Sequence, residues 1–120
     1  MNSHQEILSV VELYFKSIFA GDVDSLRSTF HPKAILSGEV KGIPYYKPLD
    51  EYLEVVKNRK SPKDLSDVFK MIVISVEVTG AIGFVKANCP MLGFNYVDYL
   101  SFVFFDGKWV IASKVFTHLD

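Results

Sequence analysis

The sequence predicts a single α+β domain, in which three N-terminal helices pack on a curved antiparallel β-sheet. Apolar residues recur at helical intervals through the first half of the chain. From Val68 onward the apolar period changes to two, as in strands, and two turn signals divide that region into hairpins. The 120 residues are the usual size of one domain, so residues 1–120 are expected to share one core.

The first helix is predicted close to the N-terminus. Ser3 and Glu6 have the spacing of a capping box, and Gly21 offers a C-terminal stop. Between them lies an apolar stripe at helical spacing, formed by Ile7, Val10, Val11, Tyr14 and Ile18. These features predict an amphipathic helix with one face against the sheet.

A second helix is predicted directly after the first. Asp22 can cap it, and Val23, Leu26 and Phe30 then share one face. Pro32 disfavours helical geometry at the preceding residue, so this helix is expected to end at His31.

A short strand is predicted over residues 34–40 and a third helix after Pro48. The helix follows from the spacing of Leu49, Leu53 and Val56. Tyr45 and Tyr46 are expected in the loop between these two elements, where they either cover a cavity or anchor the following helix.

The first hairpin is predicted around Thr79-Gly80. A two-residue turn there pairs Val78 with Ala81. The same register gives one wholly apolar face, formed by Ile72, Ile74, Val76, Val78, Ala81, Gly83, Val85 and Ala87.

Asp106-Gly107 is the strongest hairpin signal in the chain. It pairs Phe104 with Trp109, Phe102 with Ile111, Leu100 with Ser113 and Asp98 with Val115. This aromatic face is expected to pack on the helices. The reverse face, which includes Tyr99 opposite Lys114, is too apolar for water and too polar for a second core. It predicts a homodimer through the outer sheet face, the alternative being a solvated sheet in a monomer.

Composition and motifs exclude several classes of function. Thirteen basic and fourteen acidic residues give a net charge of -1, which argues against nucleic-acid binding through bulk charge. The chain contains no phosphate-binding loop, dinucleotide fingerprint or zinc-protease motif, and its three histidines are scattered, so no metal and no cofactor are expected. The lone Cys89, the lack of a signal sequence and the lack of a long apolar run predict a cytoplasmic protein that does not bind membranes.

Three stretches of sequence carry a family resemblance: FHPKA at 30–34, DYLS at 98–101 and DGKWVIASKVF at 106–116. Together with three helices before a curved meander, they resemble the nuclear-transport-factor-2-like superfamily of cystatin-related α+β cones. Within it, they are similar to the SnoaL-like group described as "putative lumazine-binding". The resemblance implies a cone whose wide mouth holds a small apolar molecule. It also implies that relatives include dehydratases, isomerases, epoxide hydrolases and polyketide cyclases.

Asp98 is the first candidate for chemistry, because the predicted register places its carboxylate on the aromatic face. Burial raises the pKa of a carboxyl group, which is how such a residue becomes a general acid or base near neutral pH. The alternative is a structural aspartate whose oxygens are satisfied by a helix terminus, a tyrosine hydroxyl or a buried water.

His31 and Tyr14 are the other candidates. An imidazole exchanges protons near pH 7, and relatives with this fold place polar groups at the mouth of the cone; the alternative for His31 is an interaction with the last carbonyls of a helix. Tyr14 could enter the cavity as an oxyanion donor, as in fold relatives, or bond to Asp98, or simply pack in the core. The expected pocket is lined by Tyr14, Phe30, Tyr96, Asp98, Leu100, Phe102, Trp109, Ile111 and Ser113.

Three functions follow from these observations. The first is a homodimer that binds a small molecule in an apolar cone. The second is a cofactor-independent lyase, isomerase or cyclase in which Asp98 or His31 moves a proton and Tyr14 stabilises an oxyanion. The third is an interaction module whose sheet face binds a different protein.

Overall fold

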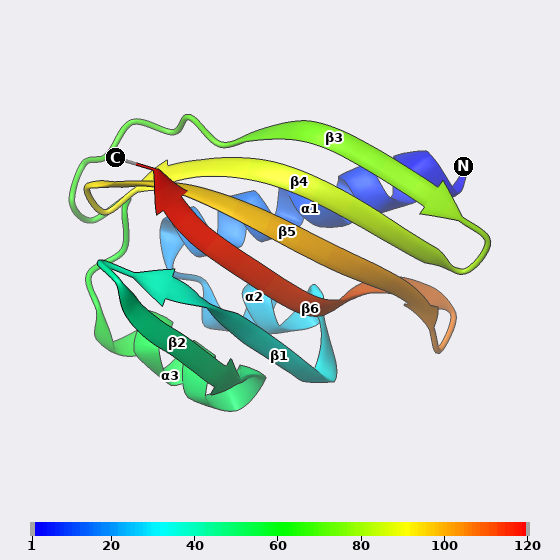
Figure 1. Ribbon diagram of the computed structural model, residues 1–120, viewed down its shortest axis with the longest axis horizontal. Helices are drawn as coiled ribbons and strands as arrows, with labels where there is room; N and C mark the ends of the chain where they lie inside the picture. The colour runs from blue at the N-terminus through cyan, green and yellow to red at the C-terminus, as the bar shows by residue number, and fades with distance from the viewer. Residues whose placement is uncertain (1, 120) are drawn as a thin grey trace.

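The computed structural model describes residues 2–119, and its helices cover one face of a curved six-stranded sheet (Figure 1). This confirms the predicted α+β class. The elements are α1 (Ser3–Ala20), α2 (Val23–Ser28), β1 (Phe30–Val40), β2 (Ile43–Pro48), α3 (Leu49–Asn58), β3 (Ile72–Thr79), β4 (Ile82–Met91), β5 (Phe94–Phe105) and β6 (Lys108–Leu119). The strand order is β2-β1-β6-β5-β4-β3, and β1 and β6 are parallel whereas the other neighbours are antiparallel. Within residues 2–119, no helix combines the length and the apolar character that crossing a membrane requires.

Helix α1 has the predicted apolar stripe and ends at the predicted Gly21, but its capping box begins one residue earlier than predicted. The side chain of Asn2 accepts a hydrogen bond from the backbone of Gln5, and the Gln5 side chain accepts one from the backbone of Asn2. Asparagine and serine cap a helix about equally well, so residue type alone does not decide between Asn2 and Ser3. Gly21 ends the helix in the left-handed region, with φ of 70°.

Helix α2 is shorter than predicted. Asp22 caps it as expected, but the helix ends at Ser28 and Phe30 already belongs to β1. The Thr29 hydroxyl donates to the carbonyl of Leu26, which closes the last turn, and Pro32 requires an extended chain before it. Strand β1 is correspondingly longer than the predicted 34–40.

The loop predicted around Tyr45 and Tyr46 is instead the edge strand β2. Lys41 and Gly42 both have positive φ, and Val40 pairs with Ile43 across this two-residue turn. Proline is tolerated on an edge strand, so Pro44 and Pro48 mask the strand in the sequence without preventing it. Helix α3 follows Pro48 as predicted.

The first hairpin differs from the predicted register in two ways. Its turn is Gly80-Ala81, with Gly80 at φ of 55°, so Val78 pairs with Gly83 rather than with Ala81. A bulge at Ile74 then reverses the predicted faces farther along β3, because Val73 lies opposite Ala87 while Ile72 and Ile74 are exposed.

The second hairpin has the predicted Asp106-Gly107 turn and the predicted pairs of Phe104 with Trp109 and Phe102 with Ile111. Beyond these pairs the predicted register is wrong. Ala112 is an extra residue in β6, because Ser101 pairs with Ser113 while Phe102 pairs with Ile111. The bulge leaves the faces of β5 unchanged and reverses those of β6.

Two predicted positions on β6 are therefore corrected. Lys114 is 4% exposed and lies on the inner face with Phe116, not on the outer face opposite Tyr99. Ser113 and Val115 lie on the outer face, and the partner of Asp98 is Phe116 rather than Val115.

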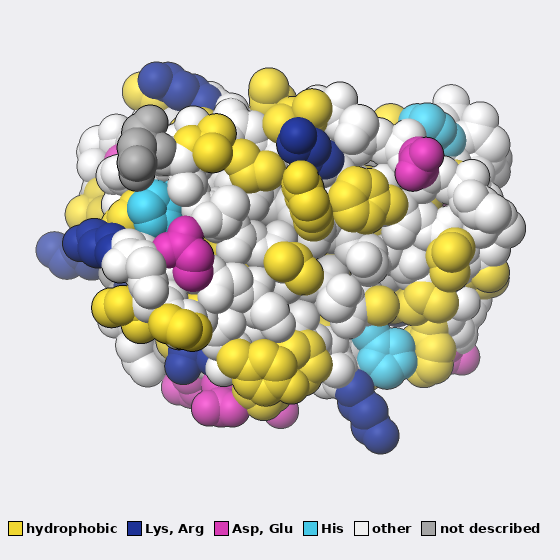
Figure 2. All heavy atoms as spheres, in the orientation of Figure 1, with side chains coloured by type: hydrophobic (Ala, Val, Ile, Leu, Met, Phe, Trp, Pro, Cys, Tyr) yellow, Lys and Arg dark blue, Asp and Glu magenta, His cyan; other side chains and the backbone are white. Residues whose placement is uncertain are grey.

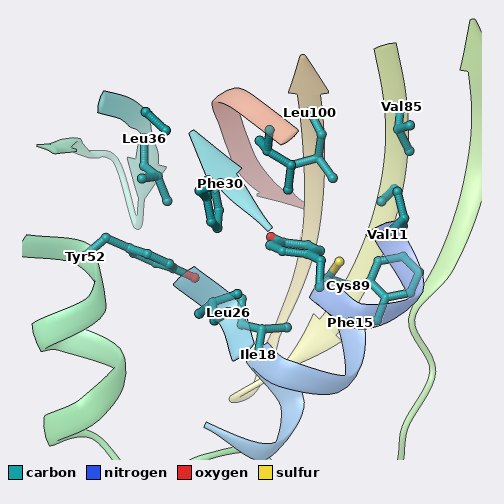
Figure 3. Packing of buried hydrophobic residues seen from close by; sticks show 14 of the residues in the cluster. Val11, Phe15, Ile18, Leu26, Phe30, Leu36, Tyr52, Val85, Cys89 and Leu100 are labelled. Carbon is teal, nitrogen blue, oxygen red and sulfur yellow. The ribbon is translucent and has the colours of Figure 1, made fainter. Parts of the chain in front are cut away.

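The core lies between the inner sheet face and the helices. Figure 3 shows Val11 and Phe15 of α1 near Val85 and Cys89 of β4, while Tyr52 reaches inward from α3. Aliphatic and aromatic side chains fill most of the space between the sheet and the helices. A hollow lies at the α3 end of the fold.

Candidate functional site

Asp98 lies in the interior of the protein, on the inner face of β5, with 2% of its surface exposed. The hydroxyl of Tyr14 on α1 donates to Oδ2 of Asp98 over 2.7 Å. This contact joins two of the three residues singled out for chemistry. The same hydrogen bond is also the one expected if Asp98 has a structural role and its oxygen is paired with a tyrosine hydroxyl.

Lys114 faces the same carboxylate from β6. Its Nζ is 3.7 Å from Oδ2 of Asp98 and 3.5 Å from the hydroxyl of Tyr52, to which it donates. The ammonium also lies 5.0–5.4 Å from the ring centres of Tyr14, Tyr52 and Phe116. Three aromatic faces and one carboxylate thus stabilise a charge that has left water.

The environment fixes which groups carry protons. Burial by itself lowers the pKa of Lys114. The Asp98 carboxylate, together with Tyr52 and Cys89, raises that pKa by more, so the net shift is upward and the side chain is a cation. Burial, and then the negative charge of Asp98, raise the pKa of Tyr14 well above its ordinary value. Tyr14 is therefore a neutral hydrogen-bond donor at physiological pH.

Cys89 is a buried thiol. It donates to Oδ2 of Asp98 over 3.5 Å. Burial, followed by the charge of Asp98, raises the pKa of this thiol. A protonated thiol is a poor nucleophile, so the geometry gives Cys89 a packing role beside the carboxylate.

A pocket of about 60 Å³ lies next to this cluster, between α3 and the sheet. Lys114 and Tyr52 belong to both the cluster and the pocket wall, whereas Asp98 and Tyr14 lie behind them. The lining residues are Val40, Tyr45, Tyr52, Val55, Arg59, Met91, Tyr96, Lys114 and Phe116. Burial, partly opposed by nearby cations, raises the pKa of Tyr45 to about 12 and also raises that of Tyr96.

His31 does not join the cluster. Its ring packs against Phe105 at an interplanar angle of 57°, with the ring centres 4.4 Å apart, and its Nδ1 accepts a hydrogen bond from the backbone of Lys33. It follows Phe30, which pairs with Ile111, whereas Asp98 pairs with Phe116 farther along β6.

The other residues of the expected pocket have three different positions. Tyr96 lines the pocket, and Ser113 lies on the outer sheet face. The remaining ones are packed in the core: Phe30, Leu100, Phe102, Trp109 and Ile111.

The sequence reasoning did not include Lys114, Tyr52 and Arg59 in the site. The bulge at Ala112 decides the position of Lys114. Tyr52 lies one residue before Leu53 and continues the apolar face of α3. This position was a weak indication in the sequence that its side chain faces inward. Arg59 follows directly after α3, outside the apolar stripe that predicts this helix. Among residues 2–119, no group of three or more His, Cys, Asp and Glu side chains is arranged to hold a metal ion.

Comparison with known families identifies the chain. The model of the family described as "Putative lumazine-binding" matches residues 2–117. The chain belongs to this family. No curated protein matches this sequence.

Solved structures agree on the fold. An NTF2-like protein of unknown function from Silicibacter pomeroyi DSS-3 has a TM-score of 0.88 at 23% identity, covering 99% of this chain and 100% of that one. A second one, from Shewanella baltica OS155, has a TM-score of 0.86 at 21% identity, covering 100% and 98%. A ketosteroid isomerase-like protein from Erwinia carotovora atroseptica SCRI1043 has a TM-score of 0.74 at 14% identity, covering 100% and 99%. This member of the putative lumazine-binding family therefore has the NTF2-like fold, and these likenesses carry no activity with them.

Proposed function

We propose that the chain is a small-molecule-binding protein whose site is the pocket between α3 and the sheet. The observation that carries the proposal is the position of this pocket against the buried pair of Lys114 and Asp98. A buried ion pair contributes little to stability compared with well-packed apolar residues, so its presence beside a pocket favours a role in binding.

The size of the pocket favours a compact ligand. A volume of about 60 Å³ is several times the roughly 10–15 Å³ that one water needs, and well below the roughly 300–1,000 Å³ of sites for larger ligands. The family description names lumazine, so this compound belongs in a ligand panel. A bicyclic ring of that kind would require Tyr45 and Tyr96 to move apart.

The test is a titration followed by two-dimensional NMR, with a panel of small neutral, cationic and anionic compounds that includes lumazine. We expect shifts confined to residues that line the pocket. In Val55→Trp, an indole fills the space and binding should be lost. Val68→Trp, at an exposed position that does not line this pocket, is the matched control. A panel that leaves every pocket resonance in place would contradict the proposal.

A second candidate is acid-base catalysis, favoured by the contact between Tyr14 and Asp98. In this account a ligand enters beyond the pocket wall, past Lys114 and Tyr52, and reaches the Asp98 carboxylate. Asp98 then removes a proton from the ligand and Tyr14 stabilises the resulting charge. The measurement is exchange of a C–H proton for deuterium in any panel compound that binds. Exchange should occur with the unchanged protein and stop in Asp98→Asn; a bound compound that never exchanges argues for binding alone.

We further propose that two copies pair through the outer sheet face. Large apolar side chains are exposed there: Ile72, Ile74, Ile82, Tyr99, Val115 and Leu119. Figure 2 shows hydrophobic groups spread over this side of the molecule. The face also has a hollow of about 300 Å³, lined in part by Lys86, Tyr99 and Val115. A second copy would present the same mixture of ridges and hollow, as an isologous interface requires.

The cellular location of the protein is also part of this proposal. We expect the chain to work in the cytoplasm, where a single unpaired thiol such as Cys89 remains reduced.

A further inference from the structure

Arg59, at the end of α3, has a buried edge without a partner. Its Nε and Nη2 atoms are shielded from solvent and make no hydrogen bond within the part of the chain that the structure describes, residues 2–119. These two nitrogens lie side by side on the planar guanidinium and point the same way, which is the geometry that donates one hydrogen bond to each oxygen of a carboxylate. Because buried donors are almost always paired in a folded protein, this edge calls for an acceptor.

The charges around the pocket leave one positive charge unbalanced. Lys114 is balanced by Asp98, from which it is separated by 3.7 Å. Arg59 makes no salt bridge among residues 2–119. A ligand with one negative charge would neutralise the site, whereas a neutral or cationic ligand would not.

The remaining wall of the pocket is largely apolar. Val40, Val55, Met91 and the ring of Phe116 surround the space into which a ligand's body would extend. Tyr45 and Tyr96 line the same space as Arg59. The pocket therefore combines the Arg59 guanidinium with a small apolar chamber. The side chains that shield the Nε and Nη2 edge must move aside for a ligand in this chamber to reach it.

We propose that the ligand of this pocket is the anion of a small monocarboxylic acid, with both carboxylate oxygens accepting hydrogen bonds from Nε and Nη2 of Arg59. This inference rests on the proposed function and adds the chemical class of the ligand. A phosphate dianion fits less well, because its second charge and third oxygen would meet apolar side chains. The pocket volume favours a short branched or cyclic acid over a long chain.

The experiment compares an acid with its uncharged analogue of the same shape. Isobutyrate and isobutyramide are titrated into the unchanged protein at constant ionic strength, and the Nε–H resonance of Arg59 is followed by NMR. We expect isobutyrate to bind at least about tenfold more tightly than the amide and to move the Nε–H resonance, because charge-assisted bidentate hydrogen bonds are lost with the amide.

Variants of Arg59 distinguish the loss of its charge from the loss of the fold. Arg59→Gln should weaken isobutyrate binding about tenfold or more, and Arg59→Lys should restore only part of it, because an ammonium cannot form the side-on pair. Lys57→Gln removes an exposed charge from the same helix and should leave binding unchanged. Each variant is first checked for an unchanged melting transition.

The outcomes distinguish the two proposals. If the amide binds as tightly as the acid and Arg59→Gln has no effect, the carboxylate inference is overturned while the pocket remains a binding site. If inorganic phosphate binds more tightly than isobutyrate, the ligand class is also overturned. If neither these compounds nor the wider panel shifts a pocket resonance, both the inference and the proposed function fail.

Discussion

Lys114 keeps its charge in the interior because several weak interactions act on one ammonium. The carboxylate of Asp98 supplies the opposite charge, and three aromatic faces and one tyrosine hydroxyl surround the remaining surface. Asp98 in turn accepts from Tyr14 and Cys89. The groups of this cluster therefore depend on one another. Removing one leaves the others buried without the interaction that compensates for their loss of water.

Removing the cation alone should be strongly destabilising. Lys114→Met leaves Asp98 buried without its counter-charge, and we expect the free energy of unfolding to fall by about 3–5 kcal/mol in urea denaturation. The double variant Asp98→Asn/Lys114→Met should lose less than the sum of the two single variants, since neither charge then remains. Lys108→Met, at an exposed position, is the control. A Lys114→Met protein as stable as this control would contradict the account.

Alkaline pH should destabilise the fold through the same groups. The folded-state pKa values of Tyr14 and Lys114 are raised above their ordinary values of 10.0 and 10.5, so the unfolded chain releases these protons first. Their stabilising contribution is complete below about pH 10 and is lost as pH rises above it. Tyr14→Phe should therefore show a slope of stability against pH that is shallower by up to about 1.4 kcal/mol per pH unit between pH 10 and 11.

The exposed Tyr46 provides the control for this measurement. Tyr46→Phe should retain the slope of the unchanged protein in urea denaturation at each pH. Identical slopes in Tyr14→Phe and Tyr46→Phe would mean that Tyr14 ionises as an exposed tyrosine does.

At the scale of elements, one inserted residue decides what the site contains. The bulge at Ala112 turns Lys114 and Phe116 inward while Asp98, on the other strand, keeps its face. The position of Asp98 could be predicted because it depends only on alternation along β5 and on the local Asp106-Gly107 turn. The position of Lys114 could not, since no glycine or proline marks the bulge and a lysine is expected to face water.

The same distinction between local and long-range causes explains the rest of the site. Helix caps and stops are encoded within a few residues, so α1, α3 and the start of α2 could be predicted. Strand β2 could not, because Pro44 and Pro48 interrupt its pattern. Arg59 becomes part of the pocket only when α3 packs against β1 and β2, which is a tertiary event without a local signal.

The parallel pairing of β1 with β6 depends on a glycine at the point of closest approach. A Cβ atom at Gly38 would collide with the carbonyl oxygen of Phe116, which is backbone and cannot rotate away. We expect Gly38→Ala to cost about 1–3 kcal/mol or more in thermal or urea unfolding and to displace Phe116 from the pocket wall.

Gly83 offers a matched comparison within the same sheet. A Cβ there would come within 2.6 Å of Cδ1 of Ile7, the end of a flexible side chain. Gly83→Ala should therefore cost less than Gly38→Ala. The reverse order would show that β1 and β6 approach each other less closely than described.

At the scale of the whole molecule, the two faces of the sheet have different occupants. The inner face is covered by the helices, and the outer face exposes large apolar side chains over β3 to β6. An exposed apolar area of this kind favours association, provided that each partner buries about 800 Å².

The proposed dimer makes a direct prediction about mass. Light scattering at micromolar concentration should give twice 13.6 kDa for the unchanged chain. Val115→Glu places a charge on the outer face and should shift the mass to that of the monomer. Leu13→Glu makes the same kind of change at an exposed position on α1 and should remain dimeric. A monomeric unchanged chain would instead favour a different protein as the partner of this face.

The most direct test of the whole account is a crystal structure of the protein as purified, with no ligand added. We predict density for a small molecule in the pocket, with two oxygens about 2.7–2.9 Å from Nε and Nη2 of Arg59 and its body against Val55 and Phe116. The contrary result would be an Arg59 fork paired with a carbonyl or carboxylate of the chain itself, and a pocket closed by Tyr45 and Tyr96.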